Sequence, residues 1–196
     1  MAPRPAVLVF AGSTRKDSFN RKMARLGAAA VERAGGAATH LELGEFPLPL
    51  FDQDLEARDG LPANALRLKE AFLAHRGLLL ACPEYNSSIT PLLKNTLDWV
   101  SRKAGTEGPL ACYEGKVAGL MSASPGALGG IRGLVTVRSL LGNIRVTVIP
   151  DQIAIPAAHD AFDEAGELKD PARSAALDAL AAALVRTCAA FDARPA

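Results

Sequence analysis

Two short apolar runs, each followed at once by a polar loop and a helical pattern, leave few folds open to this chain. Residues 6–11 and 77–82 show no alternation of apolar and polar side chains, which is typical of parallel strands buried on both faces. Strands of that kind need helices over both faces and right-handed crossovers between neighbours. The pattern predicts an α/β fold.

The rest of the chain repeats the order of strand, loop and helix. Because proline has no backbone donor, the Pro47 and Pro49 region, 45–55, is expected to be a surface loop. Helices are expected to begin at polar caps or prolines and to end at glycines. The further strands lie at 38–43, 116–123 and 145–149, and the helices run from Asp17 or Ser18 to Gly35, from near Pro62, from Thr90 to about Gly105, over 131–141, and from Asp170. We therefore expect one doubly wound, five-stranded parallel sheet with helices on both faces, in a single domain over residues 1–196.

The composition of the chain limits the kinds of molecule that the protein is expected to bind. The 196 residues are 49% hydrophobic and carry a formal net charge of +1, so no strong field attracts nucleic acid or an anionic membrane, and we expect small-molecule partners instead. Cys82, Cys112 and Cys188 form no Cys-x-x-Cys pair, which predicts reduced thiols, no metal site and a cytoplasmic location. The run 6–11 is too short for a signal peptide core, and no stretch is expected to reach transmembrane length.

The loop after the first strand, 12–20, has the chemistry of a phosphate site. Hydroxyls, an arginine and the free N–H groups of a helix start converge there, and the candidate ligands are Ser13, Arg15, Ser18 and Asn20. The alternative is a polar turn whose serine only caps the helix. The loop lacks the glycine patterns of dinucleotide and triphosphate sites, and it has no cysteine for phosphatase chemistry.

Two more loops follow predicted strands and suit a planar ring. Pro83, Glu84, Tyr85 and Asn86 offer an aromatic wall and backbone amides, although an ordinary turn explains these residues as well. The third loop, 122–130, is poor in side chains, so a ligand can lie against its backbone at Ser124 and Gly126. Glycines needed only for the turn are the alternative there.

Other polar and aromatic residues are left out of the predicted site. Lys94 and Asp98 are one helical turn apart and are expected to form an exposed ion pair. Leu97 and Trp99 are expected to be packing residues. None of the three histidines has the spacing of a catalytic or metal-binding residue.

Five segments, taken in order, resemble the NADPH-dependent FMN reductase family, which includes flavodoxin-like quinone, azo-compound and chromate reductases. They are GSTRKDSFN, LPLFDQDL, PEYNSSITPLLKNTLDW, SPGALGGIRG and AFDEAGELKD. The resemblance implies a flavodoxin-like fold, FMN as cofactor, and hydride transfer from NADPH, or NADH, through FMN to a small acceptor such as a quinone, an azo compound, chromate or free flavin.

The resemblance also implies roles for the candidate residues. Those of the first loop hold the FMN phosphate, Pro83 to Asn86 border the flavin ring, with Tyr85 and Asn86 shaping its reactive face, and Ser124 and Gly126 close the pyrimidine side. No catalytic acid or base is nominated. Homodimers or homotetramers are implied, with 47–54 as part of the partner's wall. Ser87 and the Thr90-Pro91 step depart from the pattern of relatives, which affects the expected shape of the acceptor pocket.

Two other functions stay open at the level of the sequence. One is an electron carrier in the manner of flavodoxin that docks onto protein partners, although the weak net charge disfavours electrostatic docking. The other is a scaffold of the same fold that has lost its flavin, which would be colourless when purified.

Overall fold

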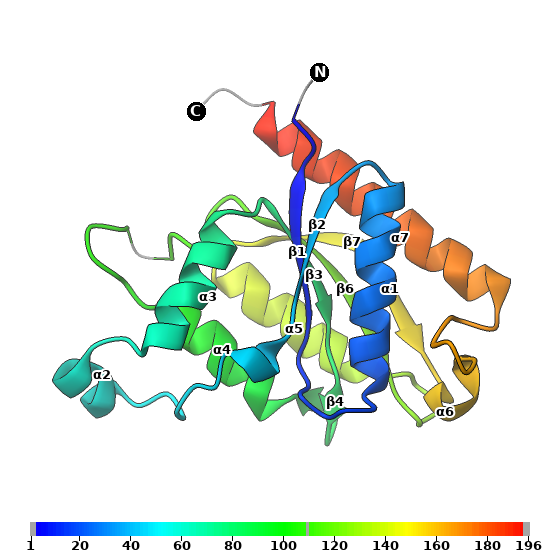
Figure 1. Cartoon of the computed structure of the whole chain (residues 1–196), viewed down its shortest axis with the longest axis horizontal. Coiled ribbons are helices and arrows are strands. Elements are labelled where there is room, and N and C mark those ends of the chain that lie inside the picture. Colours follow the sequence, from blue (N-terminus) through cyan, green and yellow to red (C-terminus); the bar gives the residue numbers. More distant parts are fainter. Residues whose placement is uncertain (1–2, 109, 194–196) are drawn as a thin grey trace.

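A computed structural model describes residues 3–108 and 110–193 and contains a five-stranded parallel sheet in the order β2-β1-β3-β6-β7 (Figure 1). Strand β1 pairs with β2 on one side and with the central strand β3 on the other, with Val7 opposite Gly77 and Ala11 opposite Ala81. The predicted α/β class and its doubly wound sheet are confirmed. The strands are β1 (Ala6–Ala11), β2 (Ala37–Leu41), β3 (Gly77–Ala81), β6 (Val117–Ala123) and β7 (Thr147–Ile155).

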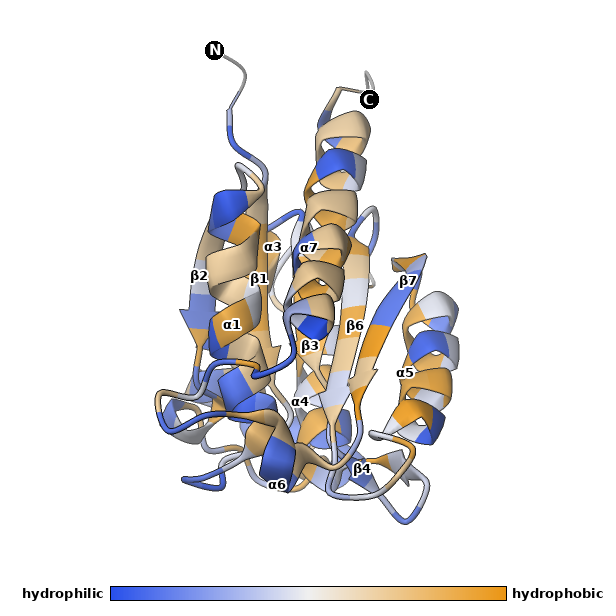
Figure 2. Cartoon of the chain, turned by 90° about the vertical axis from the view of Figure 1, so that its right-hand side faces the viewer, coloured by the Kyte–Doolittle hydropathy of each residue, from blue (hydrophilic) through white to orange (hydrophobic). Residues whose placement is uncertain are grey.

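Helices cover both faces of this sheet. The side chains of β1 alternate between two cores: Val7 and Val9 face one layer of helices, whereas Leu8 and Phe10 face the other. Figure 2 shows the sheet face-on, with α1 and α7 lying across the face nearest the viewer. The first layer contains α1 (Phe19–Arg33) and α7 (Pro171–Asp192), and the second contains α3 (Ala63–Leu73), α4 (Pro91–Ser101) and α5 (Ile131–Asn143).

Three of the predicted helix starts carry the expected caps. Ser18, Thr90 and Asp170 each accept a backbone N–H of the first turn with a side-chain oxygen. Pro91 and Pro171 then occupy the first turn, where a missing N–H costs no hydrogen bond. The polar loops that precede α1 and α4 are thereby fixed at the carboxyl ends of β1 and β3.

The structure corrects two predicted elements, a loop and a strand, and adds short elements that were not predicted. The expected loop 45–55 contains the 3-10 helix η1 (Leu43–Glu45) at its edge and the start of α2 (Gln53–Asp59), which Asp52 caps. The strand predicted at 145–149 starts at Thr147 and continues to Ile155, because a register shift against β6 accommodates Pro150. A two-stranded hairpin, β4 (Glu84–Tyr85) and β5 (Ser88–Ile89), and the short helix α6 (Ala158–Ala161) were not predicted.

Helix α7 also corrects an expectation. By length and composition its 22 residues satisfy the criterion for a membrane span, which no stretch was expected to reach. The helix packs against α1 and three strands, however, and buries Leu177, Leu180 and Leu184 in the first core. The core helix of a soluble protein passes the same test of length and hydropathy, so the finding is weak evidence for a membrane span.

Candidate functional site

The carboxyl ends of β1, β3 and β6 lie at one end of the molecule, opposite the start of β1 and the end of α7 (Figure 1). Three loops meet there around a cavity of about 110 Å³. It is here called the flavin cavity, because most of the residues predicted to bind FMN line it. Its lining includes every predicted ligand residue except Asn86 and Gly126. The lining residues are Ser13, Arg15, Ser18, Phe19, Asn20, Pro83, Glu84, Tyr85, Ala123, Ser124 and Pro125.

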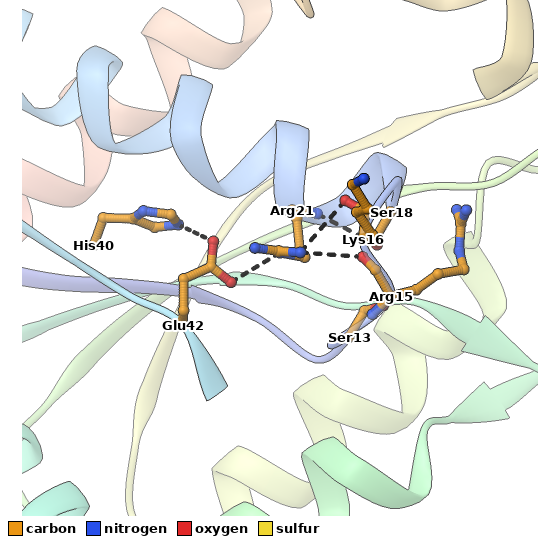
Figure 3. A network of polar contacts seen from close by, with 7 residues as sticks. All are labelled: Ser13, Arg15, Lys16, Ser18, Arg21, His40 and Glu42. Atoms are coloured by element: carbon orange, nitrogen blue, oxygen red, sulfur yellow. Dashed lines mark hydrogen bonds and ion pairs between the residues drawn. The ribbon is translucent and has the colours of Figure 1, made fainter. Parts of the chain in front are cut away.

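The first loop is held in shape by Arg21 of α1 (Figure 3). Its guanidinium donates to the carbonyl oxygens of Arg15 and Lys16, each at 3.4 Å, and to a carboxylate oxygen of Glu42 at 2.9 Å. Ser18 Oγ accepts the Arg21 N–H at 3.4 Å, and Ser13 Oγ accepts the Arg15 N–H at 3.3 Å. The loop is thus organised by its own side chains and by β2's neighbour Glu42.

His40 lies at the edge of this network, 3.8 Å from the Glu42 carboxylate. Partial burial lowers the pKa of His40 from its ordinary value; nearby Glu42 opposes this effect, whereas Arg25 and Arg21 add to it. The imidazole is therefore mainly neutral at pH 7. The charge that faces Arg21 comes from the Glu42 carboxylate.

The first loop fits a phosphate group. The exposed Arg15 guanidinium lies 5.7 Å from the centre of the Phe19 ring, and two serine hydroxyls lie at the same edge of the cavity. The first turn of α1 adds N–H groups that have no partner within the helix, and the helix dipole favours an anion there. This combination of donors suits the phosphate end of FMN.

Asn20 has a structural task that its place in the sequence does not reveal. Its amide donates to the Ala123 carbonyl at 2.8 Å and accepts the Ala123 N–H at 3.0 Å, and the residue is buried. The side chain therefore ties the first loop to the end of β6. One N–H and one lone pair remain for a ligand in the cavity that it lines.

The second loop is the β4–β5 hairpin. Asn86 and Ser87 both have left-handed backbone angles, with φ of 51° and 67°, as a two-residue hairpin turn requires. Tyr85 is 57% exposed and faces the flavin cavity, whereas Asn86 lies at the exposed tip. The hairpin presents an aromatic ring and a tight turn of backbone amides beside the cavity.

Glu84 anchors this hairpin to α5. Its carboxylate accepts the Arg132 guanidinium at 2.9 Å and the Gly133 N–H at 2.9 Å. Burial acts to raise the pKa of Glu84, but the bonds from Gly133 and Arg132 together outweigh that effect and lower it. Glu84 is therefore an ionised wall residue.

The third loop owes part of its glycine content to the turn itself. Gly129 and Gly130 have φ of 62° and 89°, and a Cβ on Gly130 would lie 2.0 Å from Ser122 Oγ. Gly126 has no such requirement; its N–H donates to Ser124 Oγ at 3.2 Å. The turn therefore explains Gly129 and Gly130, whereas contact between Gly126 and a ligand stays a prediction.

The residues left out of the predicted site are where they were expected. Lys94 and Asp98 form an exposed ion pair at 2.7 Å, and Leu97 and Trp99 are buried. Phe19 was missed: it lines the cavity and stacks on Phe162 at 5.9 Å between ring centres. No signal in the sequence pairs Phe19 with Phe162, which lies far away along the chain.

The chain resembles characterised flavoenzymes in sequence and in structure. Residues 5–160 match the family described as NADPH-dependent FMN reductase. A quinone reductase from Pseudomonas putida is 33% identical over 170 residues, which cover 86% of this chain and 87% of that protein. An NAD(P)H-dependent FMN reductase from Pseudomonas aeruginosa is 34% identical over 84% of each chain. The structure of FerB, a flavoenzyme NAD(P)H:(acceptor) oxidoreductase from Paracoccus denitrificans, aligns with a TM-score of 0.80 and 27% identity over 95% of this chain and 98% of that one.

Proposed function

Because the chain belongs to the NADPH-dependent FMN reductase family, it is an NAD(P)H-dependent flavin oxidoreductase with FMN as its cofactor, and we propose that small quinones are its electron acceptors. The names of the relatives, which include quinone reductases, support this choice. The observation that carries it is the flavin cavity, where three loops from separate strands bring together eight of the ten residues expected to bind FMN. FMN supplies the hydride chemistry when bound.

In this proposal the chain acts as one FMN-binding domain that holds and orients the reactants. The phosphate is bound by Ser13, Arg15, Ser18 and the start of α1. Asn20 holds the loop to the end of β6. Pro83, Glu84, Tyr85 and Asn86 border the ring on one side, and Ser124 and Gly126 border it on the other. Tyr85 and Asn86 lie at the exposed edge and shape the face at which nicotinamide and acceptor take turns. No side chain is proposed as a catalytic acid or base.

An anaerobic absorbance experiment tests the function. We expect the purified protein to show a flavin band that NADPH bleaches within the mixing time and that benzoquinone then restores, with NADH run in parallel. A protein that takes up FMN but fails to oxidise NADPH on a catalytic timescale would favour the electron carrier. Absence of any flavin band after addition of FMN would favour the scaffold without flavin.

Arg15→Ala is the first variant to test at the site. The exposed guanidinium lines the flavin cavity, and loss of a charge-assisted bond to a phosphate at a solvent-exposed position is expected to weaken FMN binding about tenfold. Equilibrium titration of the apoprotein with FMN measures the change. Lys94→Ala, which removes an exposed cation outside the cavity, is the matched control. Equal affinity in both variants contradicts the role of Arg15.

We also propose a homodimer or homotetramer in the cytoplasm. An apolar patch formed by Leu128, Ile131 and Val135, which are 52%, 41% and 65% exposed, supports self-association through α5. Three buried free cysteines are consistent with a reducing compartment. Residues 47–54 are the proposed contribution to the partner's flavin site. Light scattering of wild type and Val135→Asp tests the oligomer, since a charge at the patch should lower the mass.

A further inference from the structure

Two further cavities lead away from the flavin cavity. The nearer one encloses about 350 Å³ and shares Ser13, Arg15 and Tyr85 with the flavin cavity. The farther one encloses about 320 Å³ and shares Thr14 and Leu92 with the nearer one. Together they form a groove that starts at the flavin site and ends between α4 and the segment that follows β2. The far end is lined by Leu43, Gly44, Phe46, Pro47, Leu48, Asn95 and Thr96.

Among the residues that the structure describes, no charged side chain lines the far end of this groove. Arg15, at the flavin end, is the one charged residue among those that line the two cavities. The Thr90 hydroxyl donates to Gly12 O at 2.9 Å, and the Thr96 hydroxyl donates to Leu92 O at 2.8 Å. The Asn95 side chain accepts the Phe51 N–H at 2.7 Å and donates to Pro49 O at 2.9 Å. With these bonds made and no charged side chain in its described lining, the far end favours an uncharged, mainly apolar group over a charged one.

The outer wall of the groove is fixed to the body of the protein. Trp99 Nε1 donates to Pro49 O at 2.8 Å, and the Phe51 ring packs edge-on against Trp99 with ring centres 5.0 Å apart. The Arg67 guanidinium lies 4.5 Å from the centre of the Phe46 ring. A binding surface held in place in this way loses little conformational entropy when it is filled.

We propose that the groove binds the hydrocarbon side chain of a quinone acceptor whose ring lies at Tyr85 and Arg15. This inference rests on the proposed function. The occupant follows from continuity with the flavin cavity, from the lack of charge along the far end, and from a combined size within the range of small-molecule sites. Each methylene that enters the groove should improve kcat/KM up to about fourfold. The preferred acceptors, those with the highest kcat/KM, are therefore quinones with an alkyl or prenyl tail.

Two acceptors with the same ring test the proposal: the ubiquinone ring without a side chain and the same ring with a decyl chain. Wild type should prefer the decyl compound in kcat/KM. Phe46→Asn places an amide in the far end, and Gly44→Leu fills it; a Cβ on Gly44 meets Thr14 at an ordinary 3.7 Å, so the fold should tolerate the change. Both variants should lose about tenfold with the decyl compound and keep the rate with the bare ring.

Leu73→Asn is the matched control, because Leu73 is 44% exposed on α3 and lines neither cavity. It should behave as wild type. Calorimetric titration of the oxidised decyl compound gives a readout that does not depend on turnover, and Phe46→Asn should bind it about tenfold more weakly. Equal affinity in wild type and both groove variants overturns the proposal. The proposal is also overturned if the groove variants lose activity equally with both quinones and have a smaller mass by light scattering. The groove would then be a contact between subunits. Binding of the decyl compound without reduction of either quinone would overturn the proposed function and leave the groove standing.

Discussion

The guanidinium of Arg21 joins three segments that are separate in sequence: its own helix, the first loop and the end of β2 (Figure 3). All three acceptors are oxygens of the protein, so we expect Arg21 and Glu42 to hold the loop in the conformation proposed to bind phosphate. A loop shaped before binding loses less entropy when the ligand arrives. The pair is therefore a positioning pair.

Replacement of Glu42 tests that role. Glu42→Gln removes the charge from a half-buried ion pair, and because solvent screens such pairs, we expect FMN to bind about two- to fivefold more weakly. Fluorescence titration of the apoprotein measures the affinity. Glu114→Gln breaks an exposed pair with Arg145 away from the cavity and serves as control. If the two variants bind FMN alike, Glu42 has no part in shaping the loop.

Lys116 provides a pH-dependent prediction. Burial lowers the pKa of Lys116 from 10.5 to about 8, and the ammonium bonds to the His75 carbonyl. Between these two values the unfolded chain binds more protons than the folded one, so this residue's effect on stability becomes more favourable as pH rises from about 8 to 10.5. The unfolding free energy of wild type relative to Lys116→Met should rise by about 2–3 kcal/mol over that range. Urea titrations at several pH values measure it, and a flat difference contradicts the shift.

At the scale of elements, regular patterns were predictable and short segments were not. The strands β1 and β3 and the helix starts at Ser18, Thr90 and Asp170 follow from apolar runs and caps, which are local signals. The β4–β5 hairpin has only two residues in each strand, and it depends on the anchor between Glu84 and α5, a contact across 49 positions of sequence. Partners that distant leave no periodic trace.

For the site as well, features that are local in the sequence were predictable, and contacts between distant residues were not. Residue types in the three loops indicated a phosphate and a ring, because parallel strands bring their carboxyl ends together. The sequence did not reveal that Asn20 is bonded to Ala123, that Glu84 is paired with Arg132, or that Phe19 stacks on Phe162. Each of these contacts joins different elements and is set by how the helices pack on the sheet.

The hairpin turn supplies a prediction on backbone conformation. Ser87 has φ of 67°, where a side chain is unfavourable and glycine is not. With FMN saturating, Ser87→Gly should raise the unfolding free energy by about 0.5–1 kcal/mol. Ser88→Gly, one residue on and within β5, should lower it by a similar amount, since glycine weakens a strand. Urea unfolding of the two variants gives the comparison; the same sign for both would show that the turn is not strained at Ser87.

At the scale of the whole molecule, the parallel sheet separates packing from binding. Two continuous cores on opposite faces of the sheet hold the elements together, while the hydrophilic loops gather at the end that carries the flavin cavity (Figure 2). All three cysteines lie in the cores: Cys188 in the one beneath α1 and α7, Cys82 and Cys112 in the other. None of them lines the flavin cavity or the groove.

The reactivity of the three thiols therefore measures whether the two cores become exposed together. Burial raises the pKa of Cys188 to about 12, and burial also raises that of Cys82 and of Cys112, although Lys69 partly opposes it at Cys112. Since the thiolate is the reactive form, no thiol should react with a disulfide reagent in the native protein at pH 8, and three should react in denaturant. Labelling should follow global unfolding and slow further with FMN, because a ligand of the folded state lowers the unfolded population. One fast thiol in the native protein, assigned by Cys112→Ser, would instead mean that the segment around Cys112 opens on its own, without unfolding of either core.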